Sequence, residues 1–181
     1  MTLMTPEQFE ESLKNMNPRV YMNGKRVENV LENPNTRTVV ESNKASYRWA
    51  LDPEYKDIMS CYSPIIDGPV NRYTHVSTSR EDLVRKAEAG TFTAERLGTC
   101  IYRCVGYDAF HALAGTTWEM DCDLATAYHP RFMEFLKMVQ EKDLSVAGAL
   151  TEPRGRRPCM RSGSCHGRGR GSSRIRGLSA G

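Results

Sequence analysis

Apolar side chains recur at helical spacing through most of the first 142 residues, and this pattern predicts a mainly α-helical chain. Thr5-Pro6 and Ser79, each followed closely by acidic or amide residues, are typical helix starts. The clearest apolar stripe lies near the end of this region, and its predicted buried members are Phe132, Phe135, Leu136 and Val139. The predicted helices span residues 5–13, 36–50, 52–59, 79–89, 100–118 and 130–142.

Turn signals divide these helices. Asn23-Gly24, between two short β-prone runs, predicts a small β-hairpin over residues 20–27. Two prolines and a glycine predict a loop over residues 63–71, and Gly90 is the expected stop of the helix that begins at Ser79. Residues 72–75 are predicted as a short strand or an extended lead into a helix, and residues 144–150 as a strand or a last helical turn.

Composition places the chain among soluble globular proteins. Its 181 residues, with 39% hydrophobic and 26% charged side chains, suffice for one domain with a sizeable core. The sequence has no run of 18 apolar residues, so no membrane span is predicted. The N-terminus lacks the basic and then apolar pattern of a secretory signal. Six cysteines without an export signal favour a reducing, cytoplasmic location over a disulfide framework.

Charge divides the chain into an acidic body and a basic tail. Residues 153–181 contain eight arginines and no acidic residue, so the tail carries +8 and the preceding part −5. Glycine, arginine and serine dominate residues 156–181, and we expect this tail to be disordered because it has little apolar surface to bury. An arginine arm that contacts nucleic-acid phosphates is the alternative. The tail has no aromatic residue to stack on bases, so nucleic acid is not the favoured partner.

Cys100 and Cys104 are the main candidates for chemistry. On a helix, residues four apart share a face, so the spacing predicts that the two thiols lie side by side at the start of the 100–118 helix. Such a pair can bind a soft metal or an iron–sulfur cluster. It can equally be two small buried side chains, which is the usual role of free cysteine. Spacing alone leaves both readings open.

Five sequence segments carry a family resemblance. They are NMNPRVYMNG at residues 15–24, DPEY at 52–55, NRYTH at 71–75, TCIYRCVGYDA at 99–109 and YHPRF at 128–132. Together they are similar to the 4-hydroxyphenylacetate 3-hydroxylase flavoprotein family, from about Thr5 to Gly155. The paired cysteines resemble its 4-hydroxybutyryl-CoA dehydratase branch, because the flavin hydroxylases of the family carry no cluster at this place.

This resemblance implies a fold, cofactors and a reaction. Residues 1–155 would form the incomplete N-terminal helical domain of an acyl-CoA dehydrogenase-like flavoprotein, followed by the 156–181 tail. The complete enzyme would use FAD and a [4Fe–4S] cluster, dehydrate 4-hydroxybutyryl-CoA, isomerise vinylacetyl-CoA, and assemble as a homo-oligomer. Cys100 and Cys104 would be cluster ligands, whereas the remaining ligands, a cysteine and a histidine, and the catalytic base would lie beyond this chain.

The family resemblance also implies a contact with flavin near residue 150. Thr151, Glu152 and Pro153 resemble a family segment that leads into a flavin-contacting loop, and we expect them to form the edge of that site. The family pattern then breaks at residues 156–159. We therefore expect a truncated or frameshifted chain that is inactive by itself, since half a pocket binds flavin weakly.

The remaining cysteines and histidines are weaker candidates for metal ligands. Residues that match a ligand by type alone, outside any family context, are Cys122, His129, Cys159, Cys165 and His166. Cys61 and Cys122 are expected to be core or surface thiols, and His75 and His111 to serve packing and hydrogen bonding. Three hypotheses therefore compete: a dehydratase fragment, a flavin-dependent hydroxylase fragment, and a non-enzymatic helical module with a nucleic-acid-binding tail.

Overall fold

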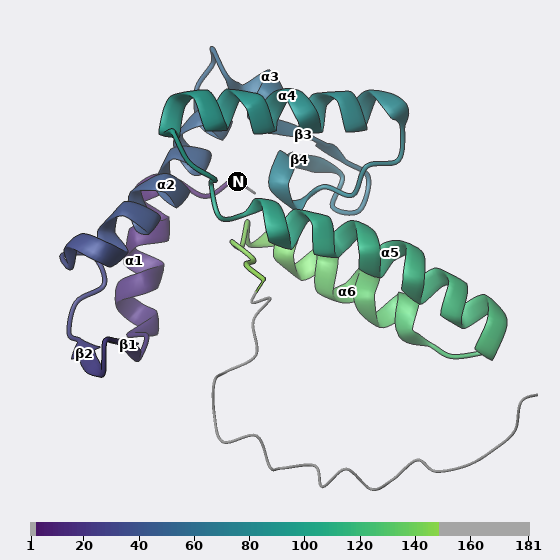
Figure 1. Ribbon diagram of the computed structural model, residues 1–181. Coiled ribbons are helices and arrows are strands. Elements are labelled where there is room, and N and C mark those ends of the chain that lie inside the picture. Colours follow the sequence, from purple (N-terminus) through teal and green to yellow (C-terminus); the bar gives the residue numbers. More distant parts are fainter. Residues whose placement is uncertain (1–2, 149–181) are drawn as a thin grey trace, which may run out of the picture. The chain divides into compact units, whose positions relative to one another are not determined.

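The computed structural model describes residues 3–148, in which helices alternate with two short β-hairpins (Figure 1). The helices are α1 (Pro6–Met16), α2 (Pro34–Leu51), α3 (Lys56–Met59), α4 (Arg80–Leu97), α5 (Cys104–Leu124) and α6 (Tyr128–Glu141). The strands are β1 (Val20–Met22), β2 (Lys25–Val27), β3 (Ser60–Ser63) and β4 (Gly68–Asn71), and a 3₁₀ turn, η1, follows at Arg72–Thr74. The mainly helical prediction is confirmed for this part of the chain.

Capping residues fix the helix starts. Thr5 and Gln8 form a reciprocal capping box before α1, and Ser79 and Asp82 form another before α4. Both starts were predicted. Asn33 caps α2 by accepting a hydrogen bond from the amide of Asn35. Helix α1 continues to Met16, beyond its predicted end at residue 13.

The first hairpin is confirmed. Strands β1 and β2 are antiparallel, with Val20 opposite Val27 and Met22 opposite Lys25. Asn23 and Gly24 connect them with φ angles of 51° and 75°. Two consecutive left-handed residues are what a tight hairpin turn of this kind requires, and asparagine and glycine tolerate that conformation best.

The predicted loop over residues 63–71 is wrong, because β3 and β4 form a second antiparallel hairpin. Proline obscured the pattern, since Pro69 lies within β4 opposite Tyr62. A two-stranded sheet tolerates proline because each strand has an outer edge that needs no ladder hydrogen bond. The turn is closed by the hydroxyl of Tyr62, which donates to Asp67 at 2.5 Å. Residues 72–74 then form the 3₁₀ turn rather than a strand.

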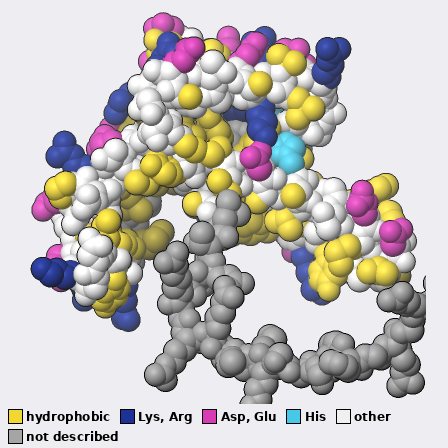
Figure 2. Space-filling model, viewed as in Figure 1, with side chains coloured by type: hydrophobic (Ala, Val, Ile, Leu, Met, Phe, Trp, Pro, Cys, Tyr) yellow, Lys and Arg dark blue, Asp and Glu magenta, His cyan; other side chains and the backbone are white. Residues whose placement is uncertain are grey.

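Helix α4 does not stop at Gly90, so that prediction is wrong. It continues to Leu97, because Phe92 and Thr93 after the glycine are buried against the core. Gly98, at φ 63°, supplies the left-handed residue that ends the helix. Arg85 forms ion pairs with Glu81 and Glu88 on the exposed side of this helix, where charged side chains gather in Figure 2.

Two apolar clusters form the core. The first brings together α2, α3, η1, α4, the segment before α5, and α5, and its buried members are Ala50, Met59, Tyr73, Ala89, Phe92, Ile101 and Tyr107. The second lies between α5 and α6, which run side by side in Figure 1, and its buried members are Phe110, Phe132, Leu136 and Val139. Phe135, predicted to be buried, is 41% exposed because it lies at the margin of the α6 stripe.

Buried polar side chains connect the second hairpin to α6. Gln140 accepts a hydrogen bond from the hydroxyl of Ser63 at 2.7 Å and donates to the carbonyl of Thr74 at 2.8 Å. Asn71 donates to the carbonyl of Ser46 in α2. No buried side-chain nitrogen or oxygen within residues 3–148 lacks a partner, as expected for a well-formed interior. No helix in this range is both long and apolar enough to cross a membrane.

After α6 the chain crosses the first turn of α5. Up to residue 148 this segment is irregular, so neither the predicted strand nor the predicted last helical turn is observed. The contact is close because α5 presents Gly106 there. A Cβ atom at residue 106 would lie only 2.0 Å from the carbonyl oxygen of Val146. Gly106 is therefore required by packing rather than by its backbone angles.

We predict that Gly106→Ala lowers the free energy of unfolding by about 1–3 kcal/mol, the usual cost of overpacking, although alanine is the better helix former. The matched control is Gly115→Ala in the same helix, where a Cβ atom would meet nothing within 4 Å. That change is expected to stabilise the chain by up to about 1 kcal/mol. Urea unfolding of the full chain measures both, and equal effects would contradict the packing argument.

Candidate functional site

Cys100 and Cys104 meet in the structure, but not on one helix. Helix α5 begins at Cys104, whereas Cys100 lies in the irregular segment before it, so the predicted shared helical face is wrong. The two sulfur atoms are nevertheless 2.6 Å apart, and the backbone amide of Tyr102 donates to the Cys100 sulfur at 3.3 Å. The predicted side-by-side placement of the thiols is thus confirmed, by a different local geometry.

Side chains in the segment between α4 and α5 are alternately buried and exposed. Ile101 and Arg103 are each only 1% exposed, whereas Cys100 and Tyr102 are exposed and Cys104 is half-buried. Tyr102 has a φ of 64°, which turns the chain into α5. The one sequence signal for this arrangement was Gly98, a glycine at the end of an apolar helical pattern, which is typical of a helix stop.

The chemistry of the pair suits a soft metal or a cluster. Burial, together with the neighbouring Cys100 thiol, raises the pKa of Cys104 to about 11, so this thiol stays protonated near neutral pH. Binding a metal would release that proton, because thiolate is the ligand form. Iron–sulfur clusters are held by cysteine thiolates, so the donor atoms fit such a group. Across residues 3–148, however, no three metal-binding side chains of the His, Cys, Asp and Glu types gather, so the pair alone is an incomplete site.

A buried ion pair lies directly behind the cysteine segment. The guanidinium of Arg103 donates to Asp143 at 3.1 Å, to the hydroxyl of Ser46 at 3.0 Å and to the carbonyl of Leu144 at 3.2 Å. Its charged centre lies 4.6 Å from the centre of the Tyr47 ring. Arg103 has no local signature in the sequence, because its partners lie 40 or more residues away.

His111 is bonded into the fold. Its Nε2 accepts a hydrogen bond from the backbone amide of Ser77 at 2.7 Å, so Nδ1 carries the ring proton and faces the carbonyl of Tyr107 at 2.9 Å. The hydroxyls of Ser77 and Tyr107 lie 2.6 Å apart. Both ring nitrogens are therefore used, which agrees with the expected structural role and leaves no nitrogen for a metal.

His75 is also held in place. Burial lowers its pKa, against the opposing effect of the Asp82 carboxylate, whose oxygen lies 3.7 Å from Nε2. The ring of His129 contacts the Thr117 hydroxyl at 3.0 Å through Nδ1. Both side chains are thus engaged in contacts within the helical body.

The other two described cysteines, Cys61 and Cys122, differ from each other in exposure. Cys61 is half-buried on β3, and burial raises its pKa to about 11, while Cys122 is exposed on α5. The remaining predicted candidates, which are Thr151, Glu152, Pro153, Cys159, Cys165 and His166, lie outside the described residues.

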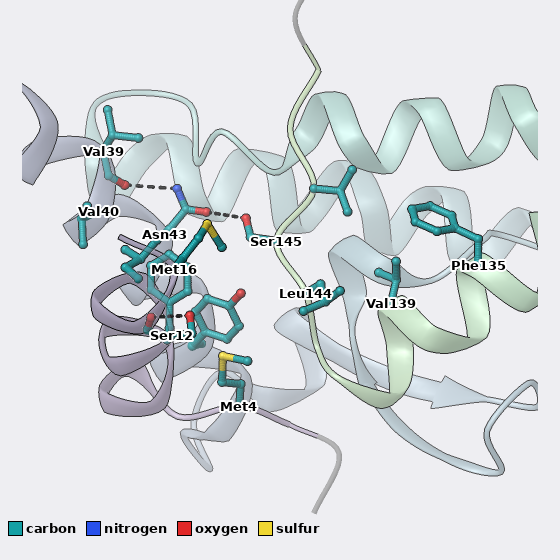
Figure 3. A pocket seen from close by; sticks show the side chains of 14 residues that line it. Met4, Ser12, Met16, Val39, Val40, Asn43, Phe135, Val139, Leu144 and Ser145 are labelled. Atoms are coloured by element: carbon teal, nitrogen blue, oxygen red, sulfur yellow. Dashed lines mark hydrogen bonds between the residues drawn. The ribbon is translucent and has the colours of Figure 1, made fainter. Parts of the chain in front are cut away.

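An apolar pocket of about 420 Å³ lies elsewhere, between α1, α2, the end of α6 and the segment after it (Figure 3). Met16, Val40 and Phe135 are among its lining side chains, and the cysteine pair is not. Asn43 fixes one wall, because its amide donates to the carbonyl of Val39 and its oxygen accepts from Ser145. Nothing charged lines this pocket, so it offers surface for packing rather than groups for catalysis.

Comparison with known proteins identifies the family. The family described as "4-hydroxyphenylacetate 3-hydroxylase N terminal" matches residues 5–165. The chain belongs to this family. It is 41% identical over 155 residues to the 4-hydroxybutyryl-CoA dehydratase/vinylacetyl-CoA-Δ-isomerase of Clostridium aminobutyricum, covering 86% of this chain and 32% of that one. The family resemblance seen in the sequence is thereby confirmed.

Solved structures agree with this assignment. An oxygen-tolerant archaeal 4-hydroxybutyryl-CoA dehydratase from N. maritimus superposes with a TM-score of 0.75 at 35% identity, over 80% of this chain and 28% of that one. The oxygenase component HpaB of 4-hydroxyphenylacetate 3-monooxygenase shares the fold, with a TM-score of 0.65 at 22% identity over 85% and 32%. This chain therefore spans about a third of the length of these relatives.

The raised pKa of Cys61 leads to a test of thiol reactivity. At pH 8 we predict that iodoacetamide alkylates Cys61 at least about tenfold more slowly than Cys122, because only the thiolate reacts and Cys61 is almost entirely protonated. Its rate should rise about tenfold per pH unit until the pH approaches 11. Peptide mapping by mass spectrometry measures both rates, and equal rates at pH 8 would contradict the assigned environment of Cys61.

Proposed function

We propose that this chain supplies the N-terminal helical domain, residues 1–155, of a 4-hydroxybutyryl-CoA dehydratase/vinylacetyl-CoA isomerase-like enzyme with an acyl-CoA dehydrogenase-like fold. The observation that carries this proposal is the adjacency of the Cys100 and Cys104 thiols, on the sequence segment that resembles the dehydratase branch. Identity supports the same choice, since it is 35–41% with the two dehydratases and 22% with HpaB. Below 25%, likeness indicates the fold alone, so a hydroxylase fragment is the weaker alternative.

Cys100 and Cys104 would be two ligands of a [4Fe–4S] cluster, completed by residues outside this chain. In the bound state such a cluster would supply a Lewis acid for the leaving hydroxyl of an acyl-CoA substrate, beside a flavin that makes its β-hydrogen acidic. The role of this chain is to present two thiols from a fixed frame. Helix α5 holds Cys104, and the segment anchored by Ile101 and Arg103 holds Cys100.

The remaining parts of the proposal rest on the family. An HpaB structure in this family contains FAD. Thr151, Glu152 and Pro153 would form the edge of the corresponding flavin site in this protein. We further propose a cytoplasmic location, because a thiol pair that binds a cluster must stay reduced, and a homo-oligomeric assembly of the complete enzyme.

A chimeric enzyme tests the ligand assignment. Residues 1–150 of this chain would replace the matching N-terminal third of the C. aminobutyricum enzyme, and iron, acid-labile sulfide and FAD would be measured after anaerobic reconstitution. We predict that Cys100→Ser and Cys104→Ser each lower the iron content several-fold, because a cluster needs its thiolates. FAD content is expected to change little.

The matched control in the chimera is Cys122→Ser, which removes an exposed thiol from the same helix as Cys104. It should leave iron and sulfide unchanged. A folded chimera whose iron content is the same in the Cys100→Ser and Cys104→Ser variants as in the parent would exclude the proposed ligand pair.

We also predict that the purified 181-residue chain does not dehydrate 4-hydroxybutyryl-CoA. Two thiols complete neither a tetrahedral nor a cluster site, and no third metal-binding side chain joins them within residues 3–148. The assay is the formation of crotonyl-CoA under anaerobic conditions with added iron, sulfide and FAD. The C. aminobutyricum enzyme serves as the positive control, and measurable turnover by this chain would refute the prediction.

A further inference from the structure

We propose that Arg103 and Asp143 are positioning residues that hold the sulfurs of Cys100 and Cys104 together. The inference rests on the proposed function in so far as it treats these thiols as a ligand pair. Neither residue would touch the metal. They would act through the backbone of the segment between α4 and α5, which carries one cysteine and leads directly into the other.

The segment between α4 and α5 needs support from outside itself. It is not helical, so the regular backbone hydrogen bonds of a helix do not fix the distance between the cysteines. Two inward side chains anchor it instead. Ile101 packs in the first core cluster, and Arg103 enters the polar site behind it. Of these two, Arg103 is the one with directional bonds.

Arg103 binds residues from two other parts of the fold. Its guanidinium contacts Ser46 and Tyr47 in α2, and Asp143 and Leu144 after α6. One side chain therefore ties the cysteine segment to two elements that are far apart in the sequence. The side chains of Arg103 and Asp143 are only 1% and 2% exposed, so these bonds are shielded from solvent.

Asp143 is in turn fixed from several sides. Its second carboxylate oxygen accepts a hydrogen bond from the amide of Met4 at 3.0 Å, and its carbonyl accepts one from the hydroxyl of Tyr47 at 3.1 Å. Tyr47 thus contacts both members of the ion pair. The Asp143 carboxylate cannot follow a displaced arginine without breaking its hydrogen bond to Met4. The ion pair therefore keeps one position in the fold.

Arg103 also lies at the junction between the cysteine segment and α5. Arg103 immediately precedes Cys104, and its carbonyl accepts the hydrogen bond from Tyr107 that opens α5. A shift of Arg103 therefore moves the start of α5 together with the segment that carries Cys100. A role in stability alone would not require an ion pair, because well-packed apolar residues often replace buried pairs without loss.

A dithiol probe tests this geometry without any cluster. In phenylarsine oxide one arsenic atom bonds two thiols, whose protons leave with the oxide oxygen as water, and no electrons are exchanged. The full chain would be used with Cys159→Ser and Cys165→Ser, so that the adduct reports the described cysteines. Mass spectrometry with peptide mapping should find one arsenical joining Cys100 to Cys104, and titration gives its affinity.

We predict that Arg103→Met weakens arsenical binding by about 10- to 100-fold, the range typical of residues that orient ligands from behind. Asp143→Asn should weaken it in the same direction. The matched control is Ser63→Ala, which removes a buried hydrogen bond to Gln140 at a place that does not touch the cysteine segment. Its affinity for the arsenical should be unchanged, whatever its melting temperature.

Arg103→Lys decides the case in which Arg103→Met does not fold. Lysine keeps the charge but presents one nitrogen in place of the planar fork, so it is expected to restore folding and only part of the affinity. Circular dichroism and thermal melting verify the fold of each variant. Folded Arg103→Lys and Asp143→Asn chains with wild-type affinity would overturn the proposal, as would an equal loss in Ser63→Ala.

The two proposals fail separately. Arsenical affinity reports how close the thiols lie, whatever their natural ligand is. Iron content of the chimera reports the cluster. Tight arsenical binding that depends on Arg103, combined with a chimera whose iron does not depend on either cysteine, would leave the positioning role intact and remove the cluster assignment.

Discussion

The described part of the chain depends on one buried ion pair. Arg103 and Asp143 lie where the N-terminal segment, α2, the start of α5 and the chain after α6 converge, and each of these four parts bonds to one or both of them. Breaking a buried pair by removing one partner costs about 3–5 kcal/mol, against a total stability of about 5–15 kcal/mol for a domain. The apolar clusters supply most of the driving force for folding, but this pair specifies how the helices meet.

The properties of the thiol site follow from the way these parts of the chain meet at Arg103 and Asp143. Cys104 is half-buried at the start of α5 and its pKa is raised, so a ligand must displace a tightly held proton. Cys100 is exposed on a segment that the interior anchors through alternate residues. One thiol therefore belongs to a rigid helix and the other to a tethered loop. Both cysteines are at least partly exposed, while Ile101 and Arg103 of the same segment are buried.

Local signals in the sequence located most helices, because capping acts over three or four residues. The Thr5 and Ser79 starts and the Asn23-Gly24 turn were all readable for this reason. The errors occurred where distant contacts decide. Gly90 looked like a stop, yet Phe92 beyond it is buried, so the helix continues to Gly98. Pro69 concealed the second hairpin, whose connection to α6 through Ser63 and Gln140 spans 77 residues. Arg103 had no local signature at all.

The cysteine spacing correctly predicted that the two thiols are adjacent, although the helix assumed to bring them together does not include Cys100. Four residues bring two side chains together on a helix, but they also do so where an extended segment enters a helix. The two cases differ in what maintains the contact. Within a helix, the backbone hydrogen bonds of that helix would keep the thiols adjacent. Here the adjacency depends on Ile101 in the core and on an aspartate 40 residues away from Arg103. The site is therefore a property of the folded domain, and it is sensitive to changes far from either sulfur.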